Sequence, residues 1–135
     1  MTIRNDPIWV SLKHVIQIQQ QTITEQGGSP GLRDQGLLES ALARPQNHFS
    51  FGEEDIFLLA ATYAEGLAKN YAFVDGNKRV AYLTADIFLY LNGYDLQNTP
   101  HINQITLFED LARDALSHAE LAEFYRRHCR KIPAT

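Results

Sequence analysis

Apolar residues recur every three to four positions along most of the chain, a spacing that gathers them on one face of an α-helix. The first helix is expected to begin at Ser11 and to end at Gly27. A second should begin at Asp34 and end at Pro45, because the proline ring is incompatible with the preceding helical turn. A third is expected over residues 53–69.

The second half of the chain carries the same helical pattern. A fourth helix is expected over residues 77–92 and a fifth, after a loop containing Pro100, over residues 107–116. Ser117 and Glu120 have the S-x-x-E spacing of a capping box, which predicts the start of a last helix.

The segment between the second and third helices has a different pattern. In residues 46–52, Phe49 and Phe51 alternate with Ser50, which favours a short β-hairpin or flap over a helix. No repeat or linker interrupts the chain, and its 135 residues suit one domain around one hydrophobic core. The sequence therefore predicts an all-α fold: a compact bundle of about six helices with a short flap or hairpin, in a single domain over residues 1–135.

Composition narrows the class of protein. A hydrophobic fraction of 44% and a charged fraction of 21% are those of a globular chain and exclude a disordered one. The net charge of -4 argues against direct binding of nucleic acid or of an anionic membrane. The first residues do not have the pattern of a signal peptide, so we expect none, and apolar runs such as residues 56–61 are far shorter than the ~20 residues that span a bilayer. A single cysteine, Cys129, suits a reducing compartment, so we expect a cytoplasmic protein.

The candidate chemistry lies in residues 71–79, between the third and fourth helices. Gly76 and Asn77 can turn backbone amides toward the start of the fourth helix, and converging amides at the positive end of a helix form an anion site. Lys78 and Arg79 add two positive charges beside it, and arginine suits the bidentate recognition of phosphate.

Asp75 precedes this turn and adds a carboxylate that can hold Mg²⁺ against the same phosphates. Together these residues predict a site for a nucleoside triphosphate. The same string also suits a simple type I turn followed by a helix with a solvated basic first turn. Cations are disfavoured at a helix N-terminus, however, and a bound anion would remove that mismatch.

The longer string resembles the Fic/Doc motif H-x-F-x-(D/E)-(A/G)-N-K-R. The matching positions are Phe73, Asp75, Gly76, Asn77, Lys78 and Arg79. The upstream blocks 27–34 and 36–46 are similar to the death-on-curing (Doc) branch of that family. The adenylyl-transferring Fic branch reads G-N-G-R-x-x-R instead, and the departures at Lys78 and Tyr82 favour the Doc branch.

The resemblance implies a toxin that transfers phosphate from ATP, with Mg²⁺, to a hydroxyl of elongation factor Tu. It implies that Asp75 binds Mg²⁺, that Gly76 and Asn77 lie in the phosphate-binding turn, and that Lys78 and Arg79 anchor the phosphates. The implied partner is a Phd-like antitoxin whose C-terminal segment lies in a groove. Transfer of AMP from ATP and a non-catalytic binding module remain as alternative functions.

The resemblance also implies that Phe73 packs in the core beneath the loop and that residues 46–52 form a flap for docking the target. The family's first motif residue is a histidine that deprotonates the target hydroxyl, and Tyr71 occupies that position here. Near neutrality an imidazole is a competent base and a phenol is almost wholly protonated, so losing the base costs ~10²–10⁴ in rate. Three interpretations are open: an inactivated toxin variant, a natural pseudoenzyme, or a substitute base at His48 or His14.

Two further features bear on the core and on reactivity. Trp9 and Tyr63 are expected to anchor the core. Cys129 lies in the basic stretch 126–131, which could lower the pKa of its thiol, but a solvated cationic helix end explains the stretch better. The remaining histidines lack the spacing of a metal site.

Overall fold

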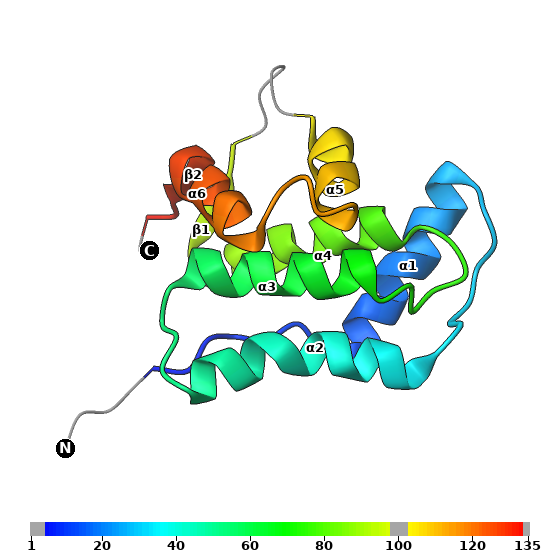
Figure 1. The fold of residues 1–135 in the computed structure, drawn as a ribbon, viewed down its shortest axis with the longest axis horizontal. Coiled ribbons are helices and arrows are strands. Elements are labelled where there is room, and N and C mark those ends of the chain that lie inside the picture. Colours follow the sequence, from blue (N-terminus) through cyan, green and yellow to red (C-terminus); the bar gives the residue numbers. More distant parts are fainter. Residues whose placement is uncertain (1–4, 98–102, 134–135) are drawn as a thin grey trace.

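The computed structural model describes residues 5–97 and 103–133. Within them the elements follow in the order α1 (Leu12–Gln26), α2 (Gln35–Ser50), α3 (Ile56–Lys69), α4 (Asn77–Leu91), β1 (Tyr94–Leu96), α5 (Gln104–Ala112), α6 (His118–His128) and β2 (Cys129–Lys131). The predicted all-α bundle of about six helices is confirmed (Figure 1). The loop expected around Pro100 lies outside the described residues.

Helix α3 is the centre of the bundle, with α2 on one side and α5 and α6 on the other (Figure 1). It also packs along α4. Its buried positions go almost all round the helix, as expected for a helix enclosed by others. Many of them are small, so neighbouring helices approach closely: a Cβ atom on Gly66 would lie 3.3 Å from the Cα atom of Ala41 in α2.

Three of the predicted helix starts are confirmed by their capping side chains. The side chain of Ser11 accepts a hydrogen bond at the start of α1, and that of Asp34 does so at the start of α2. Ser117 and Glu120 form both bonds of the capping box that begins α6. Helix α5 spans Gln104–Ala112, so it begins and ends about three residues earlier than predicted.

The predicted end of the second helix is wrong, because α2 continues through Pro45 to Ser50. The expected hairpin or flap at residues 46–52 is therefore absent: residues 46–50 are helical and the next two form a turn. Continuing the helix buries Phe49, whose ring lies edge-on to that of Trp9 at 5.8 Å. Burial of such a ring contributes roughly 1.5–3 kcal/mol, comparable with the ~3 kcal/mol that a proline costs inside a helix.

A short antiparallel sheet that the sequence did not indicate closes the C-terminal part of the chain. Tyr94 in β1 lies opposite Lys131 in β2, and Leu96 lies opposite Cys129. Each strand has only three residues, too few for a periodic pattern to be visible. The sheet joins the residues that follow α4 to those that follow α6.

The two predicted aromatic anchors do lie in the core region. Tyr63 is fully buried, and its hydroxyl accepts a hydrogen bond of 3.1 Å from the backbone of Val10. Burial raises the pKa of Tyr63 to about 12. Trp9 is partly buried and stacks on Phe88 with 5.7 Å between ring centroids. In the described parts of the chain, the helices are too short or too polar to cross a membrane.

The thiol of Cys129 differs from the sequence-based expectation. Burial raises its pKa to about 12, and the nearby carboxylates of Asp86 and Asp95 add to the effect. The lowering considered for the basic stretch 126–131 is therefore contradicted, because the thiol is half-buried beside acidic groups.

Asp86 in α4 is a mostly buried carboxyl group that links stability to pH. Its Oδ2 atom accepts a hydrogen bond of 3.1 Å from Gln104 Nε2, whereas Oδ1 is buried without a partner among the described residues. Burial raises the pKa of Asp86 to about 7, against the opposing effect of the Gln104 hydrogen bond. Between pH ~4, the pKa of an aspartate in the unfolded chain, and pH about 7, the Asp86 carboxyl is more often protonated in the folded state than in the unfolded state. This group's contribution to stability therefore falls as pH rises, by at most about 1.4 kcal/mol per pH unit.

Asp86→Asn should remove this pH dependence, because the amide is neutral at every pH in that window. It can also donate to Gln104 Oε1, which is buried without a partner in the described chain. We expect the free energy of unfolding of the variant to exceed that of the wild type at pH 8 and the gain to shrink toward pH 5. Urea denaturation of both proteins at pH 5 and pH 8 measures this gain. If the gain is the same at the two pH values, Asp86 is not the source of the pH dependence.

Candidate functional site

The loop between α3 and α4, residues 70–76 (the motif loop), is held by the segment between α1 and α2, residues 27–34. Leu32 and Phe73 form an isolated antiparallel bridge between them. The backbone N–H groups of Arg33 and Asp34 both donate to the carbonyl of Ala72, at 2.8 and 3.0 Å. Val74 also donates a backbone hydrogen bond of 3.1 Å to Gly31 in the 27–34 segment. Two segments about 40 positions apart in the chain are therefore hydrogen-bonded to each other.

The buried side chain of Gln19 in α1 ties these two segments together. Its Nε2 atom donates to the carbonyl of Asp75 at 3.2 Å and to that of Ser29 at 3.5 Å, and Oε1 accepts from the backbone of Gly31 at 3.5 Å. Gln19 was not among the residues predicted for the site. Its one available signal is spacing, because it lies four positions after the buried residue Val15.

Asn77 closes the motif loop from the other side. Its Oδ1 atom accepts a hydrogen bond from the backbone N–H of Phe73, and its Nδ2 atom donates to the Phe73 carbonyl, both at 3.0 Å. Phe73 is buried in the core, as the resemblance implied. The amide of Asn77 therefore shapes the loop, and its backbone N–H belongs to the first turn of α4.

The first turn of α4 is open to an anion. Gly76 precedes the helix with φ +78°, a left-handed conformation that suits glycine, and no side chain caps the helix. The first backbone N–H groups of a helix have no carbonyl partner within it, so those of Asn77, Lys78 and Arg79 are available to a ligand.

Asp75 lies beside this turn with a fixed orientation. Its Oδ2 atom accepts a hydrogen bond of 2.9 Å from the backbone N–H of Ser29, and a Cβ atom on Gly28 would lie 3.3 Å from that oxygen. The described residues contain no group of three potential metal ligands. One exposed carboxylate nevertheless suits Mg²⁺, which binds proteins through one or two carboxylates together with phosphate oxygens.

These residues surround a cleft of about 380 Å³, here called the motif cleft. Its walls are Tyr71, Val74, Asp75, Gly76, Asn77, Lys78, Arg79, Tyr82 and Ile105. All the predicted site residues therefore meet in one place. Tyr82 and Ile105 were not predicted: Arg79 Nη1 donates to the Tyr82 hydroxyl at 3.5 Å, and Ile105 reaches the cleft from α5.

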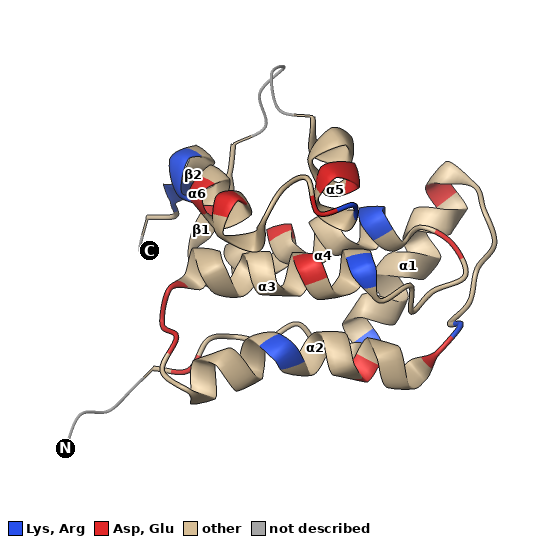
Figure 2. Cartoon of the chain, in the orientation of Figure 1, with Lys and Arg blue, Asp and Glu red and all other residues tan. Residues whose placement is uncertain are grey.

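A second hollow of about 370 Å³ adjoins the motif cleft and shares Tyr71 and Lys78 with it. Its other wall is the α5 side, including Glu109, Asp110 and Arg113. Figure 2 shows the basic first turn of α4 beside the acidic part of α5. Opposite charges thus face each other across this hollow, whereas Asp75 is the acidic residue in the wall of the motif cleft.

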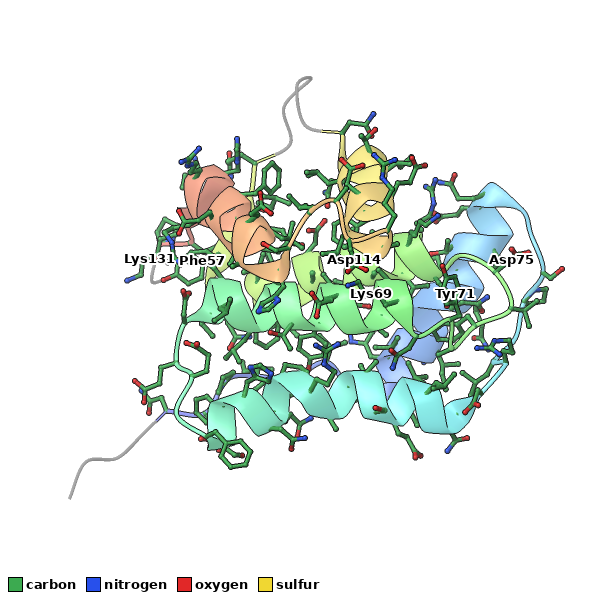
Figure 3. All side chains as sticks on the ribbon, in the orientation of Figure 1. Phe57, Lys69, Tyr71, Asp75, Asp114 and Lys131 are labelled. Atoms are coloured by element: carbon green, nitrogen blue, oxygen red, sulfur yellow. The ribbon has the colours of Figure 1, made fainter. Side chains whose placement is uncertain are left out.

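Tyr71 has an unusual backbone and an exposed side chain. Its φ is +51°, a conformation that costs energy in a residue other than glycine and that recurs at functional sites. Arg33 Nε donates to its carbonyl at 2.7 Å. Just before it, Lys69 at the end of α3 pairs with Asp114 after α5. Tyr71 and Asp75 lie at the same end of the molecule (Figure 3), and the Tyr71 side chain is 53% exposed.

Neither histidine considered as a substitute base lines the motif cleft. His48 is in the last turn of α2 and borders a different hollow with Phe51 and Glu53, before α3 begins. The 14 residues of α3, roughly 21 Å of helix, separate that end from the motif loop. His14 is in the first turn of α1, whereas Thr22 and Ile23 near its end approach Gly76.

The fold and the cleft together define a helical protein in which an uncapped helix N-terminus, two cationic side chains and one carboxylate surround the same cleft. Residues 9–89 match the model of the Fic/DOC family, and the chain belongs to this family. It is 31% identical to the protein kinase doc of Escherichia phage P1 over 119 residues, which cover 87% of this chain and 93% of that protein. It is 37% identical over 107 residues to the toxin Doc of Mycolicibacterium smegmatis, covering 73% of this chain and 81% of the relative.

Proposed function

We propose that this chain is a Doc-type toxin: a phosphotransferase that moves the γ-phosphoryl group of ATP to a hydroxyl of elongation factor Tu and thereby stops translation. The observation that carries the proposal is the motif cleft, in which an uncapped helix start, two cations and one carboxylate face the same space. One relative is named a protein kinase and another a toxin, which supports the same class of activity.

Residues 75–79 of the motif cleft each have a chemical role in this proposal. Gly76 and Asn77 form the phosphate-binding turn, and the free backbone amides that begin α4, with the charges of Lys78 and Arg79, hold the phosphates of ATP. Asp75 holds Mg²⁺, which offsets phosphate charge when bound. In phosphoryl transfer the protein contributes mainly position and electrostatic stabilisation, and this cleft supplies both.

Tyr71 limits the activity in this proposal, since it stands where the family motif has its general base. A phenol does not efficiently accept the proton of the target hydroxyl near neutral pH. The positions of His48 and His14 give no support to a substitute base. The chain is therefore proposed to bind ATP, Mg²⁺ and its partners in the cytoplasm but to turn over slowly. An inactivated toxin variant and a natural pseudoenzyme both remain compatible with this.

The proposed partner is a Phd-like antitoxin whose C-terminal segment, helical when bound, occupies a groove and blocks the site. Support comes from the relative named as a toxin, since such toxins need restraint in their own cell. Capture of a helix in a groove is a common recognition mode for helical proteins.

The position of the transferred label tests the proposed reaction. We expect the Tyr71→His variant with Mg²⁺ and elongation factor Tu to transfer label from ATP marked at the γ-phosphate and none from ATP marked at the α-phosphate. Label from the α-phosphate would instead make the protein a nucleotidyl transferase. No label from either, with ATP binding intact, would leave a non-catalytic binding module.

A further inference from the structure

Tyr71 places an acceptor-type hydroxyl in the cleft proposed to hold ATP. Its side chain lines the motif cleft with Lys78 and Arg79, and it also borders the adjoining hollow. Its hydroxyl makes no hydrogen bond to any residue of the described chain. Tyr82 has the other hydroxyl in the cleft, but that hydroxyl lies within hydrogen-bond distance of Arg79. Tyr71 is therefore the hydroxyl that is free to react.

The backbone of Tyr71 is held in place, so its side chain starts from a defined position. Arg33 Nε donates to its carbonyl at 2.7 Å, and the same arginine's backbone N–H donates to the next residue, Ala72. Asn77 fixes Phe73 through two hydrogen bonds of 3.0 Å. Holding an acceptor beside its reaction partner lowers the entropic cost of reaction, which favours transfer within one chain over transfer between chains.

The length of the side chain adds to this argument. A tyrosine hydroxyl extends further from the backbone than either imidazole nitrogen of a histidine. A base at this position would hydrogen-bond to the acceptor hydroxyl, so the longer tyrosine places its own oxygen toward the space that such a hydroxyl would occupy. The replacement therefore removes a base and supplies an acceptor.

We propose that Tyr71 accepts the γ-phosphoryl group of ATP bound in the same chain, an inference that rests on the proposed phosphotransferase function. The phenolic oxygen forms a bond to the γ-phosphorus, and the bond from that phosphorus to the β–γ bridging oxygen breaks. ADP leaves, and the phenolic proton passes to solvent. Such a transition state is loose, so positioning and charge stabilisation by Lys78 and Arg79 contribute more than a strong base.

Phosphorylated Tyr71, the product of this reaction, would itself prevent further transfer by the same chain. A phosphotyrosine carries up to two negative charges and accepts charge-assisted hydrogen bonds from lysine and arginine. At position 71 it would lie beside Lys78 and Arg79, where it competes with the phosphates of the next ATP. We expect at most one phosphoryl group per chain and weaker ATP binding by the modified protein.

The test uses the purified full chain with Mg²⁺ and γ-labelled ATP, followed by intact mass and peptide mass spectrometry. Tyr71 should gain one phosphoryl group, at a rate that does not depend on protein concentration. Tyr71→Phe keeps the ring and should lose the label. Tyr90→Phe is the matched control, because Tyr90 is 61% exposed on α4 but lies outside the motif cleft, and it should label normally. Arg79→Ala should reduce labelling about tenfold or more.

Two further measurements separate this inference from the proposed function. If the chain binds ATP and Tyr71→His phosphorylates elongation factor Tu, but Tyr71 stays unmodified, the inference is overturned and the function stands. Equal labelling of Tyr71 and Tyr90, or a rate that rises with protein concentration, also overturns it. If the chain binds no ATP and Tyr71→His is inert, both fail.

Discussion

Tyr71→His is expected to raise the rate of phosphoryl transfer to elongation factor Tu by about 10²–10⁴-fold, the usual contribution of a positioned general base. The imidazole would accept the proton of the target hydroxyl, while Asp75, Lys78 and Arg79 remain unchanged in the same cleft. The backbone also suits the change, because histidine occurs several-fold more often than most residues at positive φ, and Tyr71 has φ +51°.

Two measurements check this expectation. Initial rates of label transfer from γ-labelled ATP compare the variant with the wild type, and induction in bacteria should arrest growth only with Tyr71→His. Tyr71→Phe is the matched control, since it supplies neither a base nor an acceptor hydroxyl. Adding Arg79→Ala to Tyr71→His should abolish the arrest, which shows that the phosphate site is needed. If the Tyr71→His variant folds and binds ATP but transfers no phosphate and does not arrest growth, position 71 is not the position of the general base.

Asn77→Ala is expected to lower the free energy of unfolding by about 1–3 kcal/mol and to weaken ATP binding at least tenfold. The substitution leaves both the N–H and the carbonyl of Phe73 without the partners they have in the wild type. Without these two bonds Asn77 no longer fixes Phe73 in the motif loop, and we expect the free amides at the start of α4 to lose their orientation as a result. Denaturation by urea and titration with ATP in the presence of Mg²⁺ measure the two effects.

Two comparison variants separate the effect on stability from the effect on ATP binding. Asn77→Asp keeps the acceptor for Phe73 N–H and loses the donor, so its effect on stability should be intermediate. Arg79→Ala should weaken ATP binding with little change in stability, because Arg79 is partly exposed and its described side-chain hydrogen bond, to Tyr82, is long at 3.5 Å. If Asn77→Ala leaves ATP binding at the wild-type level, the loop does not position the phosphate site.

Features that depend on neighbouring residues in the chain were predictable. The caps at Ser11, Asp34 and Ser117 are local hydrogen bonds between residues three positions apart, so they were predicted correctly. That residues 75–79 lie together in one cleft was predictable for the same reason, because they are contiguous and turn directly into α4.

Features that depend on distant residues were missed or predicted wrongly. Helix α2 passes through Pro45 because Phe49 meets Trp9 in the core, and no local rule contains that contact. Gln19 was missed because its hydrogen-bond partners, Ser29, Gly31 and Asp75, lie on two loops that only the fold brings together.

The sequence by itself therefore determined the helical class of this protein and which residues of the 71–79 segment were candidates for the site. Only the tertiary structure decided which elements build that site: the 27–34 segment pairs with the motif loop, α1 holds both through Gln19, and α5 adds Ile105 to the cleft. It also decided that His48 and His14 lie away from the site while Tyr71 lies in it. The physical reason is range: turns, caps and helix starts form between near neighbours, whereas burial and loop pairing depend on how distant parts of the chain pack together.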